Sequence, residues 1–328
     1  MASDGQGRTY LSLLEACDNF PYDIIPSEVY YQLFLPNDDQ PHGYLLPETV
    51  QKMPWTPRFQ VTHTQPRKVT VLDTSAGKDT PGAVNAAFKE LIDICIAQNT
   101  FHVIAGVHSE PFSILSAPYP VHMERFASAL FGITSQGAYI TAYTKSTTTT
   151  TGTTDSSMRL WIPRRAKHLY TSPGMLDSTV AGGIRDGETP LDTLIHEADE
   201  EASLPEALVR ERVRSVGVLT YLCVTAADFP GEKGLVIPDI IYVHDLELPA
   251  DVVPKPKDDE VQEFYSMGVE EVQRRLLNGE FKPDSAAVLI DFFIRHGIMT
   301  AGNEKDYIEL NTRLHRRLPF RTPLQKLK

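Results

Sequence analysis

The sequence has few cysteines, few tryptophans and no long hydrophobic run. Its 328 residues include three cysteines, at positions 17, 95 and 223, and two tryptophans. An odd number of widely spaced cysteines beside apolar runs argues against a disulfide framework and a zinc site, so we expect a reducing, cytoplasmic environment. The apolar stretches, such as 288–294, are far shorter than the about 20 residues of a membrane-spanning helix. Residues 1–8 lack the pattern of a targeting segment, so we expect a soluble protein.

Positive charge is also scarce. The chain has 43 Asp and Glu against 31 Lys and Arg, which gives a formal net charge of −12. A surplus of negative charge repels polyanions, so we expect no nucleic-acid partner and no membrane partner. A small anion can still bind where a metal ion and arginines lie together. The hydrophobic content of 41% is enough for a sizeable core, and the length favours two domains.

The first part of the chain is rich in prolines and aromatic residues. Helical spacing of its apolar residues predicts a helix over 81–97, with short strands over 68–72 and 101–105 on either side. The turn before this helix contains Gly77-Lys78, which invites a phosphate-loop interpretation. That loop needs another glycine where Leu72 stands, so a capped turn is the better interpretation.

From about residue 130 onward the sequence is rich in β-branched and aromatic residues between turn signals. The strands predicted from this pattern are 138–144, 158–163, 216–224 and 235–246. Helical spacing predicts two helices, over 189–202 and 284–295. Because the second is apolar nearly all round, we expect it to be buried on more than one side and the sheet to lie between helices. The threonine-rich run 147–157 is interpreted as a flexible hairpin tip.

The helix predicted over 189–202 has an unusual concentration of acidic residues. Glu197, Glu200 and Glu201 stand at helix positions i, i+3 and i+4, so they should project within roughly 100° of one another, on a face turned away from the apolar stripe. Like charges this close repel, so the cluster either faces water or binds a hard cation. Mg²⁺ or Mn²⁺ fits oxygen ligands best. The glycine loop and Glu188 that precede the helix favour the metal site over an ordinary solvated face.

This segment resembles the Nudix box. That pattern has glycine, five residues, glutamate, seven residues, Arg-Glu, an aliphatic residue, any residue, Glu-Glu, any residue, glycine and an aliphatic residue. The matching residues are Gly182, Glu188, Glu197, Glu200, Glu201 and Leu204. His196 stands where arginine is usual, Ala198 where a larger aliphatic residue is usual, and Ser203 where glycine is usual.

The resemblance implies that Glu188 is structural and pairs with the side chain at position 196. A histidine there can form this pair fully only when protonated, near or below pH ~6.5. We therefore expect a less rigid box that keeps its metal ligands.

Further stretches resemble the fungal and plant Nudix hydrolases related to the domain fused to thiamin diphosphokinase. These stretches are 161–166, 173–183, 200–205, 258–264, 279–283 and 292–297, together with 20–22 and 130–132 for the extra N-terminal domain of that branch. The resemblance implies an α/β Nudix fold, in which an α/β/α sandwich surrounds a mixed sheet. We predict an N-terminal α+β domain over 1–129, the Nudix domain over 130–300, and a C-terminal helix with a peripheral tail over 301–328.

The activity implied by that branch is hydrolysis of thiamin diphosphate, and preferentially of its damaged oxo and oxy analogues, to the monophosphates. A diphosphate resists water because its oxygens are anionic, so catalysis must neutralise charge and orient a water molecule. We predict that Glu197, Glu200 and Glu201 hold Mg²⁺ or Mn²⁺ together with the backbone near Ala181. Glu197 and Glu201 are also counted as catalytic.

The general base is either Glu197 itself or a downstream glutamate. Glu260, in an acidic loop that we expect to precede a helix, is the first downstream candidate, and Glu263 is the second. Arg164 and Arg165 adjoin a strand end and could clamp a phosphate, although only one of two neighbours on a strand can point inward. We place the backbone of Gly182 and Gly183 beside the substrate as well.

Three alternatives stay open. The first is a Nudix hydrolase of nucleoside diphosphate-linked compounds or coenzyme pyrophosphates, which fold and box do not separate from a thiamin diphosphate hydrolase. The second is a Nudix-fold regulator that binds a diphosphate without hydrolysing it. The third is a purely structural partner of a thiamin kinase. The sequence also leaves a homodimer open.

Overall fold

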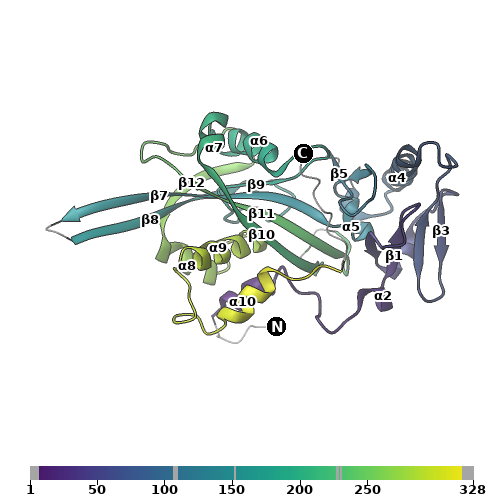
Figure 1. Cartoon of the computed structure of the whole chain (residues 1–328), viewed down its shortest axis with the longest axis horizontal. Helices are drawn as coiled ribbons and strands as arrows, with labels where there is room; N and C mark the ends of the chain where they lie inside the picture. The colour runs from purple at the N-terminus through teal and green to yellow at the C-terminus, as the bar shows by residue number, and fades with distance from the viewer. Residues whose placement is uncertain (1–6, 106–109, 151–152, 227–228, 230, 320–328) are drawn as a thin grey trace.

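A six-stranded mixed sheet forms the larger part of the molecule in the computed structural model (Figure 1). The structure describes residues 7–105, 110–150, 153–226, 229 and 231–319. The strands of this sheet are β7 (Ser135–Thr150), β8 (Thr153–Arg165), β9 (Val180–Gly183), β10 (Val213–Val224), β11 (Val236–Glu247) and β12 (Val261–Gly268). Strand β7 runs parallel to β11 but antiparallel to β8 and β9, which share its other edge.

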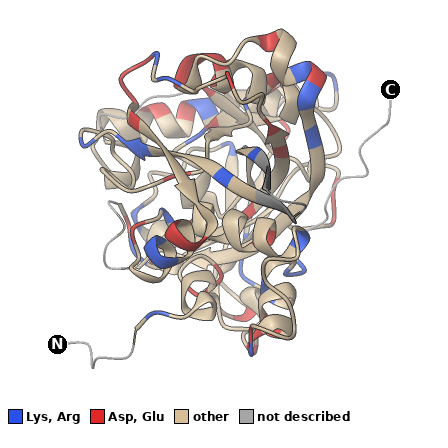
Figure 2. Cartoon of the chain, turned by 90° about the vertical axis from the view of Figure 1, so that its left-hand side faces the viewer, with Lys and Arg blue, Asp and Glu red and all other residues tan. Residues whose placement is uncertain are grey.

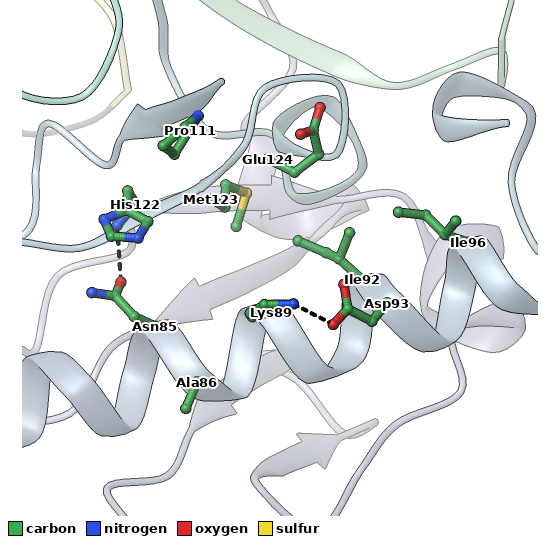
Figure 3. Close-up of a pocket in the computed structure, with 10 residues that line it drawn as sticks. All are labelled: Asn85, Ala86, Lys89, Ile92, Asp93, Ile96, Pro111, His122, Met123 and Glu124. Atoms are coloured by element: carbon green, nitrogen blue, oxygen red, sulfur yellow. Dashed lines mark hydrogen bonds and ion pairs between the residues drawn. The ribbon is translucent and has the colours of Figure 1, made fainter. Parts of the chain in front are cut away.

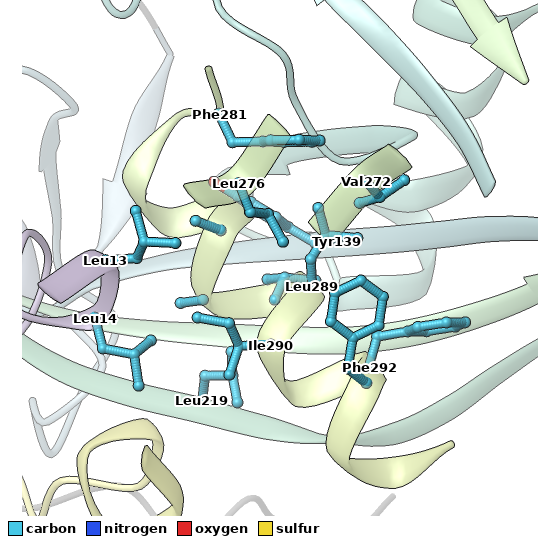
Figure 4. Packing of buried hydrophobic residues seen from close by; sticks show 14 of the residues in the cluster. Leu13, Leu14, Tyr139, Leu219, Val272, Leu276, Phe281, Leu289, Ile290 and Phe292 are labelled. Carbon is cyan, nitrogen blue, oxygen red and sulfur yellow. The ribbon is translucent and has the colours of Figure 1, made fainter. Parts of the chain in front are cut away.

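Helices cover both faces of this sheet. One face carries α6 (Pro190–Ala202) and α7 (Glu206–Arg212), and the other carries α8 (Val269–Leu277) and α9 (Pro283–Arg295) (Figure 1). Successive side chains of β7 point to opposite faces of the sheet, as in any β-strand. Ala138 and Ile140 pack beneath α6, whereas Tyr139 packs with Leu289 and Phe292 of α9 (Figure 4). The predicted α/β/α sandwich around a mixed sheet is therefore confirmed.

A smaller sheet lies in the N-terminal part of the chain, in the order β2-β1-β4-β3. Its strands are β1 (Tyr31–Phe34), β2 (Gly43–Leu45), β3 (Phe59–Thr62) and β4 (Lys68–Val71). The helices around it are α2 (Pro26–Val29), α3 (Pro47–Lys52), α4 (Thr80–Ala97) and α5 (Ser128–Phe131). A two-stranded ribbon, β5 (Pro111–Ser113) with β6 (His122–Glu124), lies between α4 and the larger sheet.

The predicted helix over 81–97 is confirmed as α4, which begins one residue earlier. Its N-cap is Asp79, whose carboxylate accepts a hydrogen bond from the Gly82 N–H at 3.0 Å, so the turn before it is a capped turn as expected. The strand predicted over 101–105 is wrong, since His102–Ile104 form a 3₁₀ turn. A short apolar run is compatible with either structure, and here Val103 and Ile104 are buried in the N-terminal core without a strand partner.

Two predictions about loops are also wrong. The threonine-rich run does lie at the tip of a hairpin, but it is not loose, because β7 and β8 stay paired as far as Thr150 and Thr153, as the β-propensity of threonine favours. Residues 151–152 lie outside the described residues. The acidic loop that ends at Glu260 leads into strand β12 and not into a helix, because the residues from Val261 onward pair with β8.

The two ends of the described chain pack on the larger sheet. Helix α1 (Tyr10–Leu14) contacts α9 and α10 (Tyr307–Leu314). The prediction of a peripheral tail is wrong at Arg316, which is buried and donates hydrogen bonds to Asp18 Oδ1 at 2.9 Å and to the Phe20 carbonyl at 2.6 Å. The domain limits at 129/130 and 300/301 stay a prediction.

Acidic and basic residues are both spread over the surface (Figure 2), as the mixed charge composition of the chain suggests. Acidic and basic segments alternate over the face shown in Figure 2, without a continuous basic stripe among the described residues in that view. Within the same described ranges, no helix is long and apolar enough to cross a membrane. All three cysteines belong to the described residues, and none of them is in a disulfide.

Candidate active site

The acidic helix α6 is anchored at both its start and its buried side. Thr189 and Asp192 form a reciprocal capping box, in which each side chain accepts a hydrogen bond from the other residue's backbone N–H, at 3.1 and 3.2 Å. Leu194 and Ala198 are fully buried against the sheet. The first turn of α6 is therefore capped, and its apolar side is packed on the sheet.

Glu201 lies inside this contact. Its side chain is buried, and its Oε2 accepts a hydrogen bond from the Ala181 N–H of β9 at 3.1 Å. The expectation that all three helix glutamates share a face turned away from the core is therefore wrong for Glu201, whereas Glu200 is exposed. The reason is that β9 pairs with β7 and brings its backbone to the helix, which helix periodicity alone does not indicate.

Glu197 reaches β9 because Gly182 has no side chain. A Cβ atom on Gly182 would lie 2.4 Å from Glu197 Cγ and 2.5 Å from its Oε1, well inside van der Waals contact. Gly183 is similarly crowded, since a Cβ there would lie 2.5 Å from Phe112 Cζ. Gly182 and Gly183 are thus needed because neighbouring side chains approach them closely, and not because of an unusual backbone conformation.

The carboxylates of the site influence one another. Burial, followed by the neighbouring charge of Glu200, raises the pKa of Glu197 to about 7, and Glu260 adds to this shift. Burial and the charge of Glu197 likewise hold the pKa of Glu201 well above its usual range, with a further contribution from Glu260. Four carboxylates therefore share one region, which costs free energy unless positive charge is supplied.

The segment before Glu260 is tied to the end of α6, which explains how a distant residue joins the cluster. The Lys255 N–H donates to the Ala202 carbonyl and the Asp258 N–H donates to the Glu200 carbonyl, both at 3.0 Å. Ser203 Oγ donates to the Lys255 carbonyl at 2.9 Å. Ser203, the residue that replaces the usual glycine, has φ +54° and thus occupies the left-handed region that glycine favours.

The donor chemistry of the cluster suits a hard divalent cation, because carboxylate oxygens are the ligands that Mg²⁺ and Mn²⁺ prefer. Within the residues that the structure describes, no three Asp, Glu, His or Cys side chains are arranged so that they could hold a metal ion together. The arrangement is therefore a carboxylate cluster that fits a cation by charge and by ligand type.

The two predicted arginines have different surroundings. Arg165 Nη1 lies 2.8 Å from Asp177 Oδ2, both side chains are largely buried, and the charge of Glu201 acts on Arg165. Arg164 instead donates to the Gly174 carbonyl at 2.8 Å and to Tyr265 Oη at 3.2 Å. Of the two, Arg165 lies on the side of the carboxylates.

Glu188 is held by two partners. Its Oε1 lies 3.1 Å from His196 Nδ1, and its Oε2 accepts a hydrogen bond from Thr193 Oγ1 at 2.7 Å. Because Thr193 is buried and does not titrate, it anchors Glu188 whatever the charge of the exposed His196.

Two further arginines, which the sequence did not single out, act on the cluster. The charges of Arg185 and Arg125 both favour the ionised form of Glu197 and partly offset the rise of its pKa. Arg185 lies in the box loop and could have been found there. Arg125 precedes the box by more than fifty residues and offered no signal in the sequence.

Two hollows lie near the box loop. A crevice of about 230 Å³ is lined by Ser113, Gln136, Ile184, Arg185, Glu188 and Tyr242, among others. A larger hollow of about 380 Å³ lies between α4 and the β5–β6 ribbon (Figure 3). None of the four carboxylates of the cluster lines either hollow, so neither volume by itself marks the site of chemistry.

The mixed sheet lies between helical layers, and its strand β9 receives the glutamates of the next helix, as expected for the predicted Nudix fold. In agreement, residues 148–291 match the family model of the NUDIX domain. Residues 148–291 of this chain therefore form a Nudix domain.

Relatives with curated names support this assignment. The chain is 35% identical over 225 residues to the uncharacterized protein YJR142W of Saccharomyces cerevisiae, a match that covers 67% of this chain and 64% of the relative. It is 32% identical to Nudix hydrolase 20, chloroplastic, of Arabidopsis thaliana, over 66% of this chain and 54% of the relative. It is 31% identical to Nudix hydrolase 24, chloroplastic, of the same plant, over 65% of this chain and 54% of the relative. The chain thus spans less than two thirds of the length of these relatives.

Proposed function

We propose that this chain is a metal-dependent hydrolase of a small organic diphosphate. The observation that carries the proposal is the contact of Glu197 and Glu201 with Gly182 and Ala181 of β9, within a cluster that also includes Glu200 and Glu260. The match of residues 148–291 to the NUDIX domain and the likeness to two relatives named as Nudix hydrolases support it.

The residues have separate roles in this proposal. Glu197, Glu200 and Glu201 would hold Mg²⁺ or Mn²⁺, which when bound neutralises phosphate charge and lowers the pKa of a water molecule. Glu260, or Glu197 in its place, accepts the proton of the attacking water. The water oxygen bonds to phosphorus as the bridging P–O bond breaks, so that a monophosphate ester and inorganic phosphate leave.

The substrate side of the site has its own residues. Arg165 is held by Asp177 and the Thr171 carbonyl, and we assign it to the phosphates because the charge of Glu201 acts on it. Arg164, which is held by Gly174 and Tyr265, is the weaker candidate. The space beside Gly182 and Gly183 is taken by Glu197 and Phe112, so these glycines act on the substrate through the side chains that they admit. The box pair of Glu188 and His196 holds the loop against the helix.

Thiamin diphosphate and its oxo and oxy analogues are the substrates that we propose first. The support is the resemblance of segments on both sides of the box to the thiamin-related branch, and the matches to yeast and plant relatives that extend well beyond the box. Nucleoside diphosphate-linked compounds and coenzyme pyrophosphates are the alternative within the same family. The cytoplasmic location and the homodimer stay predictions.

A substrate panel tests this proposal. Thiamin diphosphate, oxythiamin diphosphate, ADP-ribose, NADH and coenzyme A are incubated with Mg²⁺ or Mn²⁺, and release of phosphate or phosphomonoester is measured. Glu201→Gln keeps an acceptor for the Ala181 N–H and should lower the rate by about 100-fold or more. Glu206→Gln, at an exposed position on α7, is the matched control and should keep the wild-type rate.

The outcomes separate the alternatives. Faster hydrolysis of the thiamin compounds by wild type and Glu206→Gln, but not by Glu201→Gln, supports both the metal-dependent hydrolysis and the thiamin-related branch. Turnover of another compound keeps the hydrolase and contradicts the thiamin substrate. No turnover of any compound contradicts the hydrolase and favours a protein that binds a diphosphate without cleaving it.

A further inference from the structure

The N-terminal part of the chain holds the box loop between β9 and α6. The Asp186 N–H donates to the Pro111 carbonyl at 2.9 Å, and Ser113 Oγ donates to the Asp186 carboxylate. His122 Nδ1 lies 3.2 Å from Asp186 Oδ2, while the His122 N–H donates to Asn85 Oδ1 of α4 at 3.0 Å (Figure 3). The β5–β6 ribbon is therefore fixed on one side to α4 and on the other to the loop that leads into the acidic helix.

This ribbon places Arg125 over the start of the box. Arg125 follows β6 directly, and a Cβ on Gly183 would lie 3.3 Å from its Cζ and Nη2. Its guanidinium lies 5.2 Å from the ring centre of Phe112 and 5.7 Å from that of Phe126, which restrict its position. The side chain is still 42% exposed, so a ligand can reach it.

Arg185, in the box loop, approaches the same Glu110 carboxylate as Arg125, and its side chain is equally exposed. One carboxylate oxygen, Oε1 of Glu110, lies between the two guanidinium groups, 3.4 Å from Arg125 Nη1 and 3.6 Å from Arg185 Nε. These distances are longer than those of well-formed charge-assisted hydrogen bonds. Two positive charges against one negative charge leave these three side chains with a net positive charge, and both arginines act electrostatically on Glu197.

We propose that Arg125 and Arg185 together bind the diphosphate group of the substrate, so that the active site is shared between the N-terminal part and the Nudix domain. The planar fork of arginine matches two phosphate oxygens at once, and a diphosphate supplies oxygens on neighbouring phosphorus atoms. Glu110 keeps the two guanidinium groups together until the more highly charged substrate takes its place. The inference rests on the proposed function for the identity of the substrate.

Steady-state kinetics on the best substrate of the panel test this inference in the full chain. Arg125→Ala should raise KM by about 10- to 100-fold, which is the loss of one hydrogen-bonded charge pair, with a smaller effect on kcat. Arg125→Lys should recover part of the loss. Arg58→Ala is the matched control, because Arg58 is another partly exposed, ion-paired arginine of the N-terminal part, and it should leave KM unchanged.

Glu110→Gln separates substrate binding from a structural role. If Arg125 served only to hold Glu110, Glu110→Gln would raise KM as Arg125→Ala does. Direct binding predicts instead that KM stays the same or falls, since a competing carboxylate is removed. An unchanged KM in Arg125→Ala, or an equal rise in Glu110→Gln, overturns the inference.

Calorimetric binding of inorganic pyrophosphate with Mg²⁺ distinguishes the two proposals. If wild type hydrolyses a substrate and Arg125→Ala matches it in KM and in pyrophosphate affinity, the inference fails and the hydrolase stands. If wild type hydrolyses nothing but binds pyrophosphate at least tenfold more tightly than Arg125→Ala, the hydrolase fails and the inference stands. Absence of both turnover and binding in wild type overturns both.

Discussion

The carboxylate of Glu197 reaches the sheet because position 182 has no side chain. Gly182 has no unusual φ, so its role is to leave space for Glu197. Three carboxylates from one helix and Glu260 from the segment before β12 then share a volume that is partly closed to water. At the residue scale, the chemistry of the site depends on this close approach.

Replacing Gly182 with alanine therefore separates activity from stability. The new Cβ displaces Glu197 while the strand backbone tolerates alanine, so turnover should fall by about 100-fold, as expected for a misplacement of about 1 Å. The free energy of unfolding, measured with urea, should change by less than about 1 kcal/mol. Gly297→Ala is the control that should affect stability and not activity. Gly297 has φ +67°, which alanine disfavours, and a Cβ there would have no atom within 4 Å. This substitution should cost about 1–2 kcal/mol of stability and keep the turnover rate; wild-type turnover in Gly182→Ala would contradict the assigned contact.

At the scale of elements, the structure shows which features can be predicted from local sequence. Helices α4 and α6 were predicted because their caps and apolar spacing lie within the helix and its first turn. Strand β12 was missed, since its pairing with β8 is a long-range contact that an acidic turn does not indicate.

The same distinction holds for the site. The helix glutamates follow a motif, so they could be named from the sequence. The burial of Glu201 depends on the pairing of β9 with β7, and the position of Arg125 depends on the ribbon packed on the box loop. Both features depend on contacts between elements that are distant in the sequence, so the sequence of a single element does not predict them.

An ion-pair cluster joins the end of α9 to the end of β11. Arg295 forms two hydrogen bonds with Asp245, at 2.7 and 3.0 Å, and His296 Nε2 lies 2.8 Å from the same carboxylate. Burial raises the pKa of Asp245, but the hydrogen bonds from His296 and Arg295 outweigh it, and the pKa lies below its usual range. A lowered folded-state pKa means that this stabilisation is complete above the unfolded-state pKa of about 3.9 and is lost as pH falls through the lower folded value.

Asp245→Asn tests this pH dependence. At pH 7 the variant should be less stable than wild type by about 2–3 kcal/mol, because Arg295 loses a charged, partly buried partner. Urea unfolding at about pH 7, 5, 4 and 3 should show the difference shrinking only below about pH 4. A difference that is the same at every pH would show that the charge of Asp245 does not contribute.

At the scale of the whole molecule, segments from the two ends of the described chain meet beneath the larger sheet. Arg316 is buried against Asp18, and the Leu222 N–H of β10 donates to the same Asp18 oxygen at 3.2 Å. A buried charge that loses its partner is costly, so this contact ties the first and last helices to the Nudix domain.

Arg316→Met should lower the free energy of unfolding by about 3 kcal/mol or more, because Asp18 remains buried without its main cation. Arg317→Met is the control at the next, exposed position and should change stability by less than about 0.5 kcal/mol. Thermal or urea unfolding measures both variants. Equal stability of the two would mean that the tail is peripheral after all.

The central claim is that the carboxylates of α6 form the metal site of a diphosphate hydrolase. It is tested most directly by the rate of hydrolysis of the preferred diphosphate as a function of Mg²⁺ concentration, in wild type and Glu201→Gln. The account predicts no turnover by wild type after chelation, a rate that saturates with Mg²⁺, and a rate at least about 100-fold lower in the variant at every concentration. Full turnover by chelated wild type, or a variant that follows the wild-type curve, would contradict it.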